Sequence, residues 1–319
     1  MDLSIIIVNW NSREYLKQCI ASILAETHGV EYEIVVIDNA SFDGSGEMLR
    51  KCYPQVQFVQ GDRNLGFAKA NNAAFHQSNG RHVLFLNPDT VVVGPAVKIM
   101  LDYLQNLPNA GAVGCKLLNS DKTVQTSCIQ PFPTILNQLL DSEALRTFWP
   151  ESSLWGNAAL LGGRNGPVEV EAISGACMML RRNVFEGVGF FTEDYFMYTE
   201  DIDLCYKVGQ AGLKNYFLPC ATVVHFGGGS TGEGGSRISE IWMRESIWRF
   251  MRRNRGRRYS FSYRISTLIA ALGRMVILTM LLPLYIVRPN RKSWNTSFRK
   301  WGGILAWSVG LGDMAGNHS

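Results

Sequence analysis

The sequence contains little that would support a disulfide framework or a structural zinc site. It has seven cysteines, an odd number, and no two of them form a Cys-x-x-Cys pair. Disulfide-stabilised domains usually carry even numbers of cysteines, and structural zinc sites use closely spaced cysteine pairs. The cysteines therefore indicate a chain that keeps its thiols reduced, in a reducing compartment.

Long uninterrupted apolar runs are also missing. Charged and polar residues follow soon after the run 5–8, so we interpret that run as a buried strand and expect no signal peptide. The stretch 265–287 has 23 residues, enough to span a bilayer, but Arg274 and Pro283 interrupt it. An arginine at the centre of a membrane helix costs about 2.5–3.5 kcal/mol. We therefore expect helices that lie in the membrane interface, with a spanning hairpin as the alternative.

The C-terminal part of the chain has few acidic residues. Residues 237–319 carry 15 Lys and Arg against 3 Asp and Glu, a net charge of +12. Residues 1–236 carry 16 basic and 24 acidic residues, a net charge of −8. A basic region of this kind binds anionic lipid or nucleic acid. Its arginines precede an apolar stretch and do not alternate with aromatic residues, so we favour an anionic membrane surface and expect no nucleic-acid partner.

What the sequence does contain, over about its first 110 residues, is an alternation of strands and helices. Apolar runs predict strands at 3–8, 33–37, 56–59 and 83–86. One helix is predicted to begin after Ser12, its N-cap, and a second is predicted over 44–52. This alternation predicts a parallel sheet with helices on both faces, in which ligands bind beyond the carboxyl ends of the strands. Asn9, Asp38 and the turn Asn87-Pro88-Asp89 fall at these ends.

The region from about 111 to 195 is less regular. Residues 121–166 are rich in Pro, Ser, Asn and Gly and predict a long loop or flap. After it, the pattern predicts a strand at 174–180 that starts at a pocket, a helix at 199–212 with an acidic first turn, and a strand at 221–224. His225 follows that last strand.

Asp89 and His225 are candidate metal ligands. A carboxylate held by a proline turn at a strand end can bind Mg²⁺ or Mn²⁺, with substrate phosphates completing the coordination shell. However, Asn-Pro-Asp is also ordinary turn chemistry, and a lone histidine is more often structural. These residues alone leave both interpretations open.

Two further features suggest a nucleotide ligand. Asp38, at the end of the second strand, can accept hydrogen bonds from a ribose or a base edge, although it can equally cap the next helix. The run Asn64–Asn72 contains Gly66, which allows close approach of the backbone. The helix that follows would present free amides to an anion.

Glu200, Asp201 and Asp203 place three carboxylates within four residues at the start of a predicted helix. Like charges raise one another's pKa, as a general base near neutral pH requires. A solvated acidic helix start is the alternative. No Ser–His or Cys–His arrangement suggests a covalent nucleophile.

Six motifs occur in a fixed order and are together far more specific than any one of them. They are SIIIVNWN at 4–11, VIDNASFDGS at 36–45, NLGFAKANN at 64–72, LNPD at 86–89, SGAC at 174–177 and EDIDLC at 200–205. Over about residues 3–230, the chain resembles the family 2 glycosyltransferases with the GT-A fold, in particular the bacterial rhamnosyltransferase-like branch.

The resemblance implies an α/β fold with a Rossmann-like, mostly parallel sheet flanked by helices. The catalytic domain would comprise residues 1–236, with a nucleotide-sugar-binding half of about 1–110 and an acceptor-binding half of about 111–236. Residues 237–319 would form a basic and apolar helical region that associates with a membrane.

The resemblance also implies roles for individual residues in a single-displacement, inverting transfer from a nucleoside-diphosphate sugar. Val8, Asn9, Asp38, Asn64, Gly66, Asn71, Asn87 and Asp89 would bind the donor. Asp89 matches the last acid of the family's DxD motif, Asn87 stands in place of its first acid, and Asp89 and His225 would hold Mg²⁺ or Mn²⁺. Asp201 matches the catalytic base with Glu200 beside it, and Gly175 would border the acceptor pocket.

On this basis we expect an enzyme of cell-surface polysaccharide synthesis at the cytoplasmic face of the plasma membrane. The branch suggests dTDP-rhamnose as the donor, with galactofuranose or hexose donors as alternatives. The acceptor would be a saccharide or a polyprenyl-linked saccharide.

Three other classes explain less of the sequence. A nucleotidyltransferase would carry a glycine-rich N-terminal phosphate loop, but residues 9–12 contain no glycine. A non-enzymatic polyanion-binding protein would account for the basic region only. A glycosidase with paired carboxylates would have no use for a nucleoside pocket.

Overall fold

The computed structural model describes residues 1–141, 143–150, 152–161, 166–227, 236–287 and 291–311. Contacts divide the chain into two compact units, one of residues 1–132 and 143–232 and one of residues 133–142 and 233–319. The segment 133–142, which we predicted to lie in a loop of the catalytic domain, therefore groups with the C-terminal helices.

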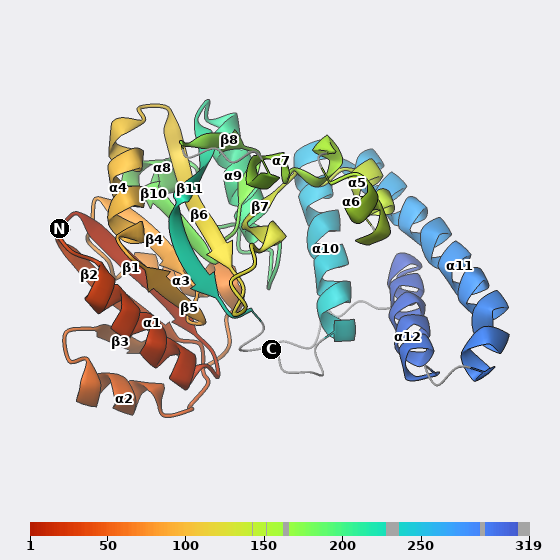
Figure 1. Cartoon of the computed structure of the whole chain (residues 1–319), viewed down its shortest axis with the longest axis horizontal. Helices are drawn as coiled ribbons and strands as arrows, with labels where there is room; N and C mark the ends of the chain where they lie inside the picture. The colour runs from red at the N-terminus through yellow and green to blue at the C-terminus, as the bar shows by residue number, and fades with distance from the viewer. Residues whose placement is uncertain (142, 151, 162–165, 228–235, 288–290, 312–319) are drawn as a thin grey trace. The chain divides into compact units, whose positions relative to one another are not determined.

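The first unit contains a nine-stranded sheet (Figure 1). Its strands are β1 (Leu3–Asn9), β2 (Tyr32–Asp38), β3 (Gln57–Gln60), β4 (His82–Leu86), β5 (Thr90–Val93), β6 (Ala110–Leu118), β8 (Val168–Val170), β10 (Cys177–Arg181) and β11 (Lys214–His225). Their order is β3-β2-β1-β4-β10-β6-β11-β5, and β8 pairs with β11. A separate two-stranded ladder joins β7 (Ile129–Gln130) and β9 (Ala172–Ile173).

One side of the main sheet is parallel, as the alternation of strands and helices predicted. The strands β3, β2, β1 and β4 all run in the same direction. Every residue of β4 is buried, and only Val8 of β1 is partly exposed, because helices cover both faces of a sheet of this type. Beyond β4 the sheet is mixed, since β10 runs antiparallel to both of its neighbours and β5 runs antiparallel to β11.

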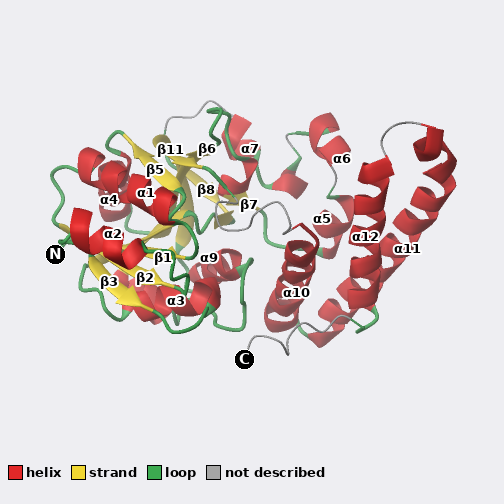
Figure 2. Ribbon diagram, turned by 90° about the horizontal axis from the view of Figure 1, so that it is seen from below, coloured by secondary structure: helices red, strands yellow, loops and turns green. Residues whose placement is uncertain are grey.

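Helices flank the sheet on both faces. The helices of the first unit are α1 (Arg13–Glu26), α2 (Ser45–Cys52), α3 (Gly66–Phe75), α4 (Ala96–Asn106), α6 (Glu143–Phe148), α7 (Ala158–Leu161), α8 (Arg182–Gly187) and α9 (Glu200–Gln210). Of these, α1, α2, α3, α4, α8 and α9 contact strands of the sheet. Helices α1 and α4 lie on one face and α3 and α9 on the other (Figure 2). The buried residues of α1 recur at helical spacing, at Leu16, Cys19, Ile20 and Ile23, and this recurrence explains why α1 packs as an amphipathic helix.

One local prediction was confirmed only in part, and another was wrong. Ser12 is the N-cap residue of α1, and its carbonyl oxygen accepts from the Leu16 N–H (2.8 Å), but its hydroxyl donates to the carbonyl oxygen of Trp10 (2.9 Å) and caps no helical N–H. The described part of the region 121–166 contains α5 (Ile135–Leu140), α6, α7, β7 and the 3-10 helices Thr126–Cys128 and Ser153–Trp155, and is not one long loop. Thr134 begins α5 by accepting a hydrogen bond from the Asn137 N–H (3.1 Å), a capping box that we did not predict.

Strand pairing brings distant parts of the chain to the carboxyl ends of the parallel strands. Asn9 lies opposite Asp38 in the β1–β2 pair, Cys177 opposite Leu86 in the β10–β4 pair, and His225 opposite Thr90 in the β11–β5 pair. Val8, Asn87, Asp89 and Gly175 lie within two residues of these pairs, and the register of the sheet therefore decides which of these residues meet.

The second unit is helical and comprises α5, α10 (Ser236–Arg255), α11 (Arg257–Val287) and α12 (Arg291–Ser308). Gly256 allows the abrupt turn between α10 and α11, since its φ of 89° is a left-handed value that glycine tolerates best. The Trp307 indole N–H donates to the Glu245 carboxylate (2.9 Å), and Arg264 donates to the Trp307 carbonyl oxygen (2.8 Å). These contacts join α10, α11 and α12.

One side of α11 is exposed and apolar. Its exposed large hydrophobic residues are Phe261, Ile265, Ile269, Leu272, Val276, Ile277, Met280 and Leu281. Most of them are three or four residues apart and therefore share one face of the helix. Residues Arg257–Leu282 form the one helix in the described part of the chain that is long and apolar enough to cross a membrane, and only 11% of its most apolar window is buried.

Candidate active site

Asn9 and Asp38 form a buried polar pair where β1 and β2 end. Asp38 accepts hydrogen bonds from the Asn9 amide (2.9 Å), from both the backbone N–H (2.7 Å) and the hydroxyl (2.5 Å) of Ser41, and from the Gln60 amide (3.1 Å). The amide oxygen of Asn9 is buried and has no hydrogen-bond partner. Asp38 therefore makes its hydrogen bonds within the protein, whereas the Asn9 oxygen is an acceptor without a partner.

The start of α3 differs from what the sequence suggested. Its first N–H groups already have partners within the protein: Leu65 donates to Asn39, Gly66 to Asn64 and Phe67 to the carbonyl oxygen of Phe196. A Cβ atom at Gly66 would lie 2.4 Å from that Phe196 oxygen. Gly66 thus allows another part of the chain to approach, and the prediction of free amides for an anion was wrong for these three groups.

Asn71 and Asn64 also serve the local structure. Asn71 is 2% exposed, and its amide donates to the carbonyl oxygen of Phe67 (3.0 Å), one turn earlier in α3. The Asn64 oxygen accepts from the Asn39 amide (2.7 Å) as well as from the Gly66 N–H. Of the residues predicted for the nucleoside pocket, Asn9 and Asp38 meet directly, Val8 lies beside them in β1, and Asn71 is turned inward.

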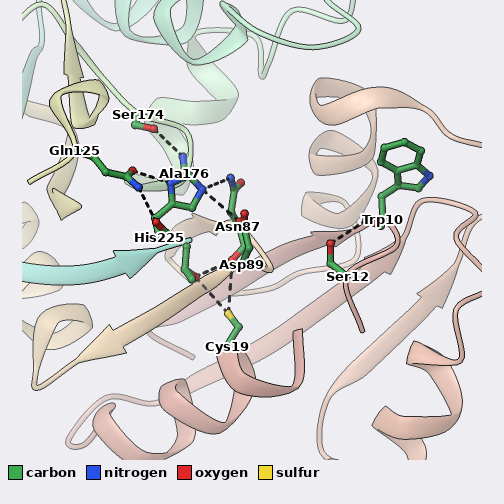
Figure 3. Close-up of polar contacts among 10 residues, drawn as sticks. Trp10, Ser12, Cys19, Asn87, Asp89, Gln125, Ser174, Ala176 and His225 are labelled. Atoms are coloured by element: carbon green, nitrogen blue, oxygen red, sulfur yellow. Dashed lines mark hydrogen bonds and ion pairs between the residues drawn. The ribbon is translucent and has the colours of Figure 1, made fainter. Parts of the chain in front are cut away.

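Asp89 and His225 meet across the β5–β11 pair (Figure 3). The His225 Nε2 lies 3.3 Å from an Asp89 carboxylate oxygen, and the Phe226 N–H donates to the Asp89 carbonyl oxygen (2.9 Å). The Asn87 amide nitrogen lies 3.4 Å from the same His225 Nε2. The side chains of Asp89 and His225 are 8% and 16% exposed, so both are largely shielded from water.

Thr90 and Cys19 stabilise the turn that carries Asp89. The Thr90 hydroxyl donates to the Asn87 carbonyl oxygen (2.7 Å), and the Cys19 sulfur lies 3.5 Å from that hydroxyl. Burial raises the pKa of the Cys19 thiol to about 12, so Cys19 stays protonated and acts as a packing residue. Neither residue carried a signal in the sequence.

Gln125 was also missed by the sequence analysis. Its amide nitrogen donates to the His225 carbonyl oxygen (2.6 Å), and its amide oxygen lies 2.9 Å from the His225 Nδ1 (Figure 3). The residue lies in the region that we predicted to be a flap, 100 positions from His225. No local pattern marks a glutamine of this kind.

The chemistry of this donor set fits a divalent cation. A carboxylate, an imidazole and an amide converge, and ions such as Mg²⁺ are held by one or two carboxylates with substrate phosphates completing the shell. An imidazole nitrogen that faces a carboxylate oxygen at 3.3 Å also needs a proton or a cation between the two atoms. No group of three or more His, Cys, Asp or Glu side chains that could hold a metal occurs in the described residues, so most other ligands would have to come from the substrate or water.

Asp201 occupies the first turn of α9 and is held by backbone N–H groups. One carboxylate oxygen accepts from the Gly175 N–H (2.9 Å) and the other from the Ile202 N–H (2.8 Å). A Cβ atom at Gly175 would lie 3.2 Å from the Asp201 Cβ, so a glycine permits this close approach. Just before the helix, Tyr198 and Thr199 adopt left-handed φ values of 71° and 69°, which are costly for residues other than glycine and often occur at functional sites.

Burial, more than mutual repulsion, shifts the pKa values of the two neighbouring acids. Burial raises the pKa of Glu200 to about 8, with a smaller contribution from the charge of Asp201. Burial also raises the pKa of Asp201, but the N–H groups of Gly175 and Ile202 oppose this rise. One oxygen of Glu200 is buried without a hydrogen-bond partner. The proton shared by this pair therefore belongs to Glu200, and the negative charge to Asp201.

Asp203, the third acid of the motif, has a structural role. It is fully buried and accepts hydrogen bonds from the hydroxyls of Thr192 (2.6 Å) and Tyr195 (3.2 Å). It anchors the segment before α9 and is separate from the pair that faces Gly175.

A single turn connects the two groups of candidate residues. Gly175 donates to Asp201, and the carbonyl oxygen of the next residue, Ala176, accepts from the Asn87 N–H (3.0 Å) (Figure 3). The Ser174 hydroxyl accepts from the Ala176 N–H (3.2 Å) and stabilises the turn. Asp201 and the Asn87–Asp89 turn are thus attached to adjacent residues of the chain.

Comparison with known proteins supports the motif-based interpretation. Residues 4–189 match the family model described as "Glycosyl transferase family 2". The chain is 32% identical over 244 residues to the N-acetylglucosaminyl-diphospho-decaprenol L-rhamnosyltransferase of Mycobacterium tuberculosis, an alignment that covers 72% of this chain and 78% of that protein. It is 25% identical over 263 residues to the rhamnosyltransferase WbbL of Escherichia coli (strain K12), which covers 79% of this chain and 93% of that protein.

A solved structure supports the fold. The mannosyltransferase PcManGT of Pyrobaculum calidifontis, solved with GDP-Man and Mn²⁺, matches with a TM-score of 0.58 at 16% identity, over 97% of this chain and 86% of that chain. The family match overrules the nucleotidyltransferase, glycosidase and non-enzymatic interpretations, and confirms the resemblance found in the sequence. The chain belongs to the family 2 glycosyltransferases, in their rhamnosyltransferase-like branch, and has the GT-A fold.

Proposed function

We propose that the protein transfers a sugar from a nucleoside-diphosphate sugar to a hydroxyl group of a saccharide, with inversion at the anomeric carbon. The observation that carries this proposal is the position of Asp201. Its carboxylate is held by two backbone N–H groups, carries the charge of the Glu200–Asp201 pair, and is connected through the 174–176 turn to the Asp89 cluster. A base and a diphosphate-binding group so connected suit a single displacement.

The proposed donor is dTDP-rhamnose, and the proposed acceptor is a lipid-linked saccharide. The names of the relatives from M. tuberculosis and E. coli support this choice, because both are rhamnosyltransferases and the first acts on a decaprenol-linked sugar. Galactofuranose and hexose donors remain the alternatives. Release of nucleotide from a panel of dTDP-rhamnose, UDP-galactofuranose, GDP-mannose and UDP-hexoses would identify the donor.

In the donor site, Asp89 and His225, with Asn87 beside them, would hold Mg²⁺ or Mn²⁺. When bound, such an ion neutralises the negative charge that develops on the leaving diphosphate. The unpartnered oxygen of Asn9 would accept a hydrogen bond from the nucleoside, and Asp38 would orient Asn9 through their 2.9 Å hydrogen bond. Four other predicted residues would form the structure around this pocket, since most of their contacts lie within the protein. They are Val8, Asn64, Gly66 and Asn71.

The acceptor hydroxyl would lose its proton to Asp201. Glu200 has a raised pKa and keeps its own proton near neutral pH, so it does not compete for this one. The hydroxyl oxygen then attacks the anomeric carbon from the face opposite the diphosphate, and this geometry inverts the carbon. Gly175 would border the acceptor, because a side chain at that position would crowd Asp201.

We further propose that the second unit binds an anionic membrane at its cytoplasmic face. Arg252, Arg253, Arg255, Arg257 and Arg258 are all exposed around the α10–α11 turn. Each basic residue near an anionic leaflet contributes about 1 kcal/mol. The exposed apolar face of α11 supplies a hydrophobic contact beside them, and patches of this kind mark protein or membrane interaction sites. The tendency of basic residues to stay on the cytoplasmic side supports this orientation.

The first prediction concerns the base. The substitution Asp201→Asn should reduce the rate of sugar transfer by about a hundred- to ten-thousand-fold, the usual effect of losing a general base. Donor affinity should stay within a few-fold, because asparagine has the same shape. Steady-state turnover and calorimetric titration of the nucleotide would measure both quantities, with Asp102→Asn on α4 as the control. Near-normal turnover would remove Asp201 from this role and make Glu200 the next candidate.

The second prediction concerns the proton on Glu200. Its pKa of about 8 in the folded chain exceeds the ordinary value of 4.5, so the folded chain binds this proton more tightly than the unfolded chain. The resulting stability is complete below pH 4.5 and is lost as the pH rises towards 8. Replacing Glu200 with Gln should reduce the decline in unfolding free energy between pH 5 and pH 8 by on the order of 3 kcal/mol. Urea denaturation at several pH values would test this, and the exposed Glu47→Gln variant should behave like the wild type.

The third prediction concerns the cation. A chelator should stop the transfer reaction, and Mg²⁺ or Mn²⁺ should restore it. Asp89→Ala should weaken the binding of both the cation and the donor, whereas Asp121→Ala, in an exposed turn, should change neither. Full activity in excess chelator would show that the chain stabilises the diphosphate by other means.

The fourth prediction concerns the membrane. The protein should float with anionic liposomes in a density gradient and stay at the bottom with neutral ones. If high salt releases it, the contact is mainly electrostatic, and if only detergent releases it, α11 is inserted. Replacing the five exposed arginines with glutamine should weaken flotation, whereas Arg50→Gln with Lys51→Gln on α2 should not. A wild-type protein that stays at the bottom with anionic liposomes would defeat the membrane proposal.

A further inference from the structure

The side chain of Gln125 contacts His225 at two points, and the chain holds it there firmly. The Gln125 N–H donates to the Leu117 carbonyl oxygen (2.9 Å), and Val124 pairs with Leu118 at the end of β6. The 3-10 helix Thr126–Cys128 begins at the next residue, and Cys128 is buried. Gln125 is therefore fixed on both sides, between a chain reversal and a buried anchor.

The orientation of the Gln125 amide follows from its contact with the backbone. The His225 carbonyl oxygen can only accept a hydrogen bond, so the amide group 2.6 Å from it must be the NH₂ group. The amide oxygen is then the atom that lies 2.9 Å from the His225 Nδ1. Rotating the amide by 180° would place two oxygens at hydrogen-bond distance with no proton between them.

An amide oxygen beside Nδ1 requires that Nδ1 carry the hydrogen. A neutral imidazole carries one N–H, so Nε2 then bears the lone pair. This Nε2 lies 3.3 Å from the Asp89 carboxylate oxygen. The lone pair and the carboxylate thus face the same small space, which is the arrangement that two ligands of one cation need.

We infer that Gln125 is a positioning residue that holds His225 as the Nδ1–H tautomer and thereby presents Nε2, together with Asp89, to a divalent cation. This inference rests on the proposed cation site. The hydrogen bond to the backbone fixes the amide, the amide fixes the imidazole, and the imidazole completes the pair with Asp89. Groups that orient a metal-binding histidine in this way typically change metal affinity by about 10- to 100-fold when they are replaced.

The first experiment determines the tautomer in the metal-free, full-length protein. Long-range ¹H–¹⁵N correlation spectra distinguish a protonated ring nitrogen from an unprotonated one, and a His225→Gln sample assigns the signals. At pH 8, the wild type should show a protonated Nδ1, whether or not a second proton lies between Nε2 and Asp89. In Gln125→Leu this preference should be lost, because Nδ1 no longer faces an acceptor.

The second experiment measures the affinity for Mn²⁺ alone by electron paramagnetic resonance. Gln125→Leu should bind Mn²⁺ about 10- to 100-fold more weakly than the wild type. Gln125→Glu keeps an acceptor for the Nδ1–H but sets a carboxylate oxygen against the His225 carbonyl oxygen, which lies 2.6 Å from the present NH₂ group, so it should lose affinity as well. Gln105→Leu makes the same change at an exposed position of α4 and should match the wild type. Thermal unfolding identifies any variant that fails to fold, and Gln125→Met would then replace Gln125→Leu.

Several outcomes would overturn the inference. One is a wild-type spectrum in which Nε2 carries the only ring proton and Nδ1 carries none. Another is a folded Gln125→Leu protein that keeps both tautomer and affinity. Wild-type affinity in Gln125→Glu would also overturn it, because the bond to the backbone would then not position the side chain. If His225→Ala leaves Mn²⁺ binding unchanged while the tautomer still depends on Gln125, the proposed cation site fails and the orienting contact does not.

Discussion

The antiparallel pairing of β5 with β11 is the constraint on which the candidate active site depends. It sets Thr90 opposite His225, and the Phe226 N–H then reaches the carbonyl oxygen of Asp89. A slip of one residue in this register would turn the side chain of His225 to the opposite face of the sheet. The side chains of Asp89 and His225 would then no longer face each other, and Gln125 would have no imidazole to orient. The short pairing of four residues in β5 therefore decides whether the site exists.

Hydrogen bonds from the backbone decide which of the two adjacent acids, Glu200 or Asp201, carries the negative charge. Asp201 receives two backbone N–H groups, whereas one oxygen of Glu200 is buried without any partner. Two adjacent acids thus differ in the group that holds the proton, because burial penalises a charge that has no donors far more than one that has two. The left-handed residues Tyr198 and Thr199 set the direction in which this pair leaves the loop. The uneven supply of hydrogen bonds therefore leaves the negative charge on Asp201.

The second unit has exposed basic residues and an exposed apolar helix face next to each other. The exposed arginines gather where α10 gives way to α11, and the exposed hydrophobic residues continue along α11. Arg264 is drawn inward instead, where it lies over the rings of Trp248 and Trp307 at 5.8 Å and 5.3 Å. Arg264 therefore helps to hold the helices together, whereas the five arginines around the turn are exposed.

The sequence by itself determined the parallel strands, their polar ends and the family, because these depend on local periodicity and on short motifs that lie within one element. It correctly placed Asn9 and Asp38 at adjacent strand ends, since parallel strands end at one edge of a sheet. It could not determine that the Phe67 amide at the start of α3 is already bonded, or that Gly66 makes room for Phe196, since both contacts join segments about 130 residues apart. Gln125 was equally beyond reach, because a glutamine has no pattern of its own and becomes significant only when the fold places His225 against it. Local structure follows from neighbouring residues in the chain, whereas a site assembled from strand register and side-chain hydrogen bonds exists only in the tertiary structure.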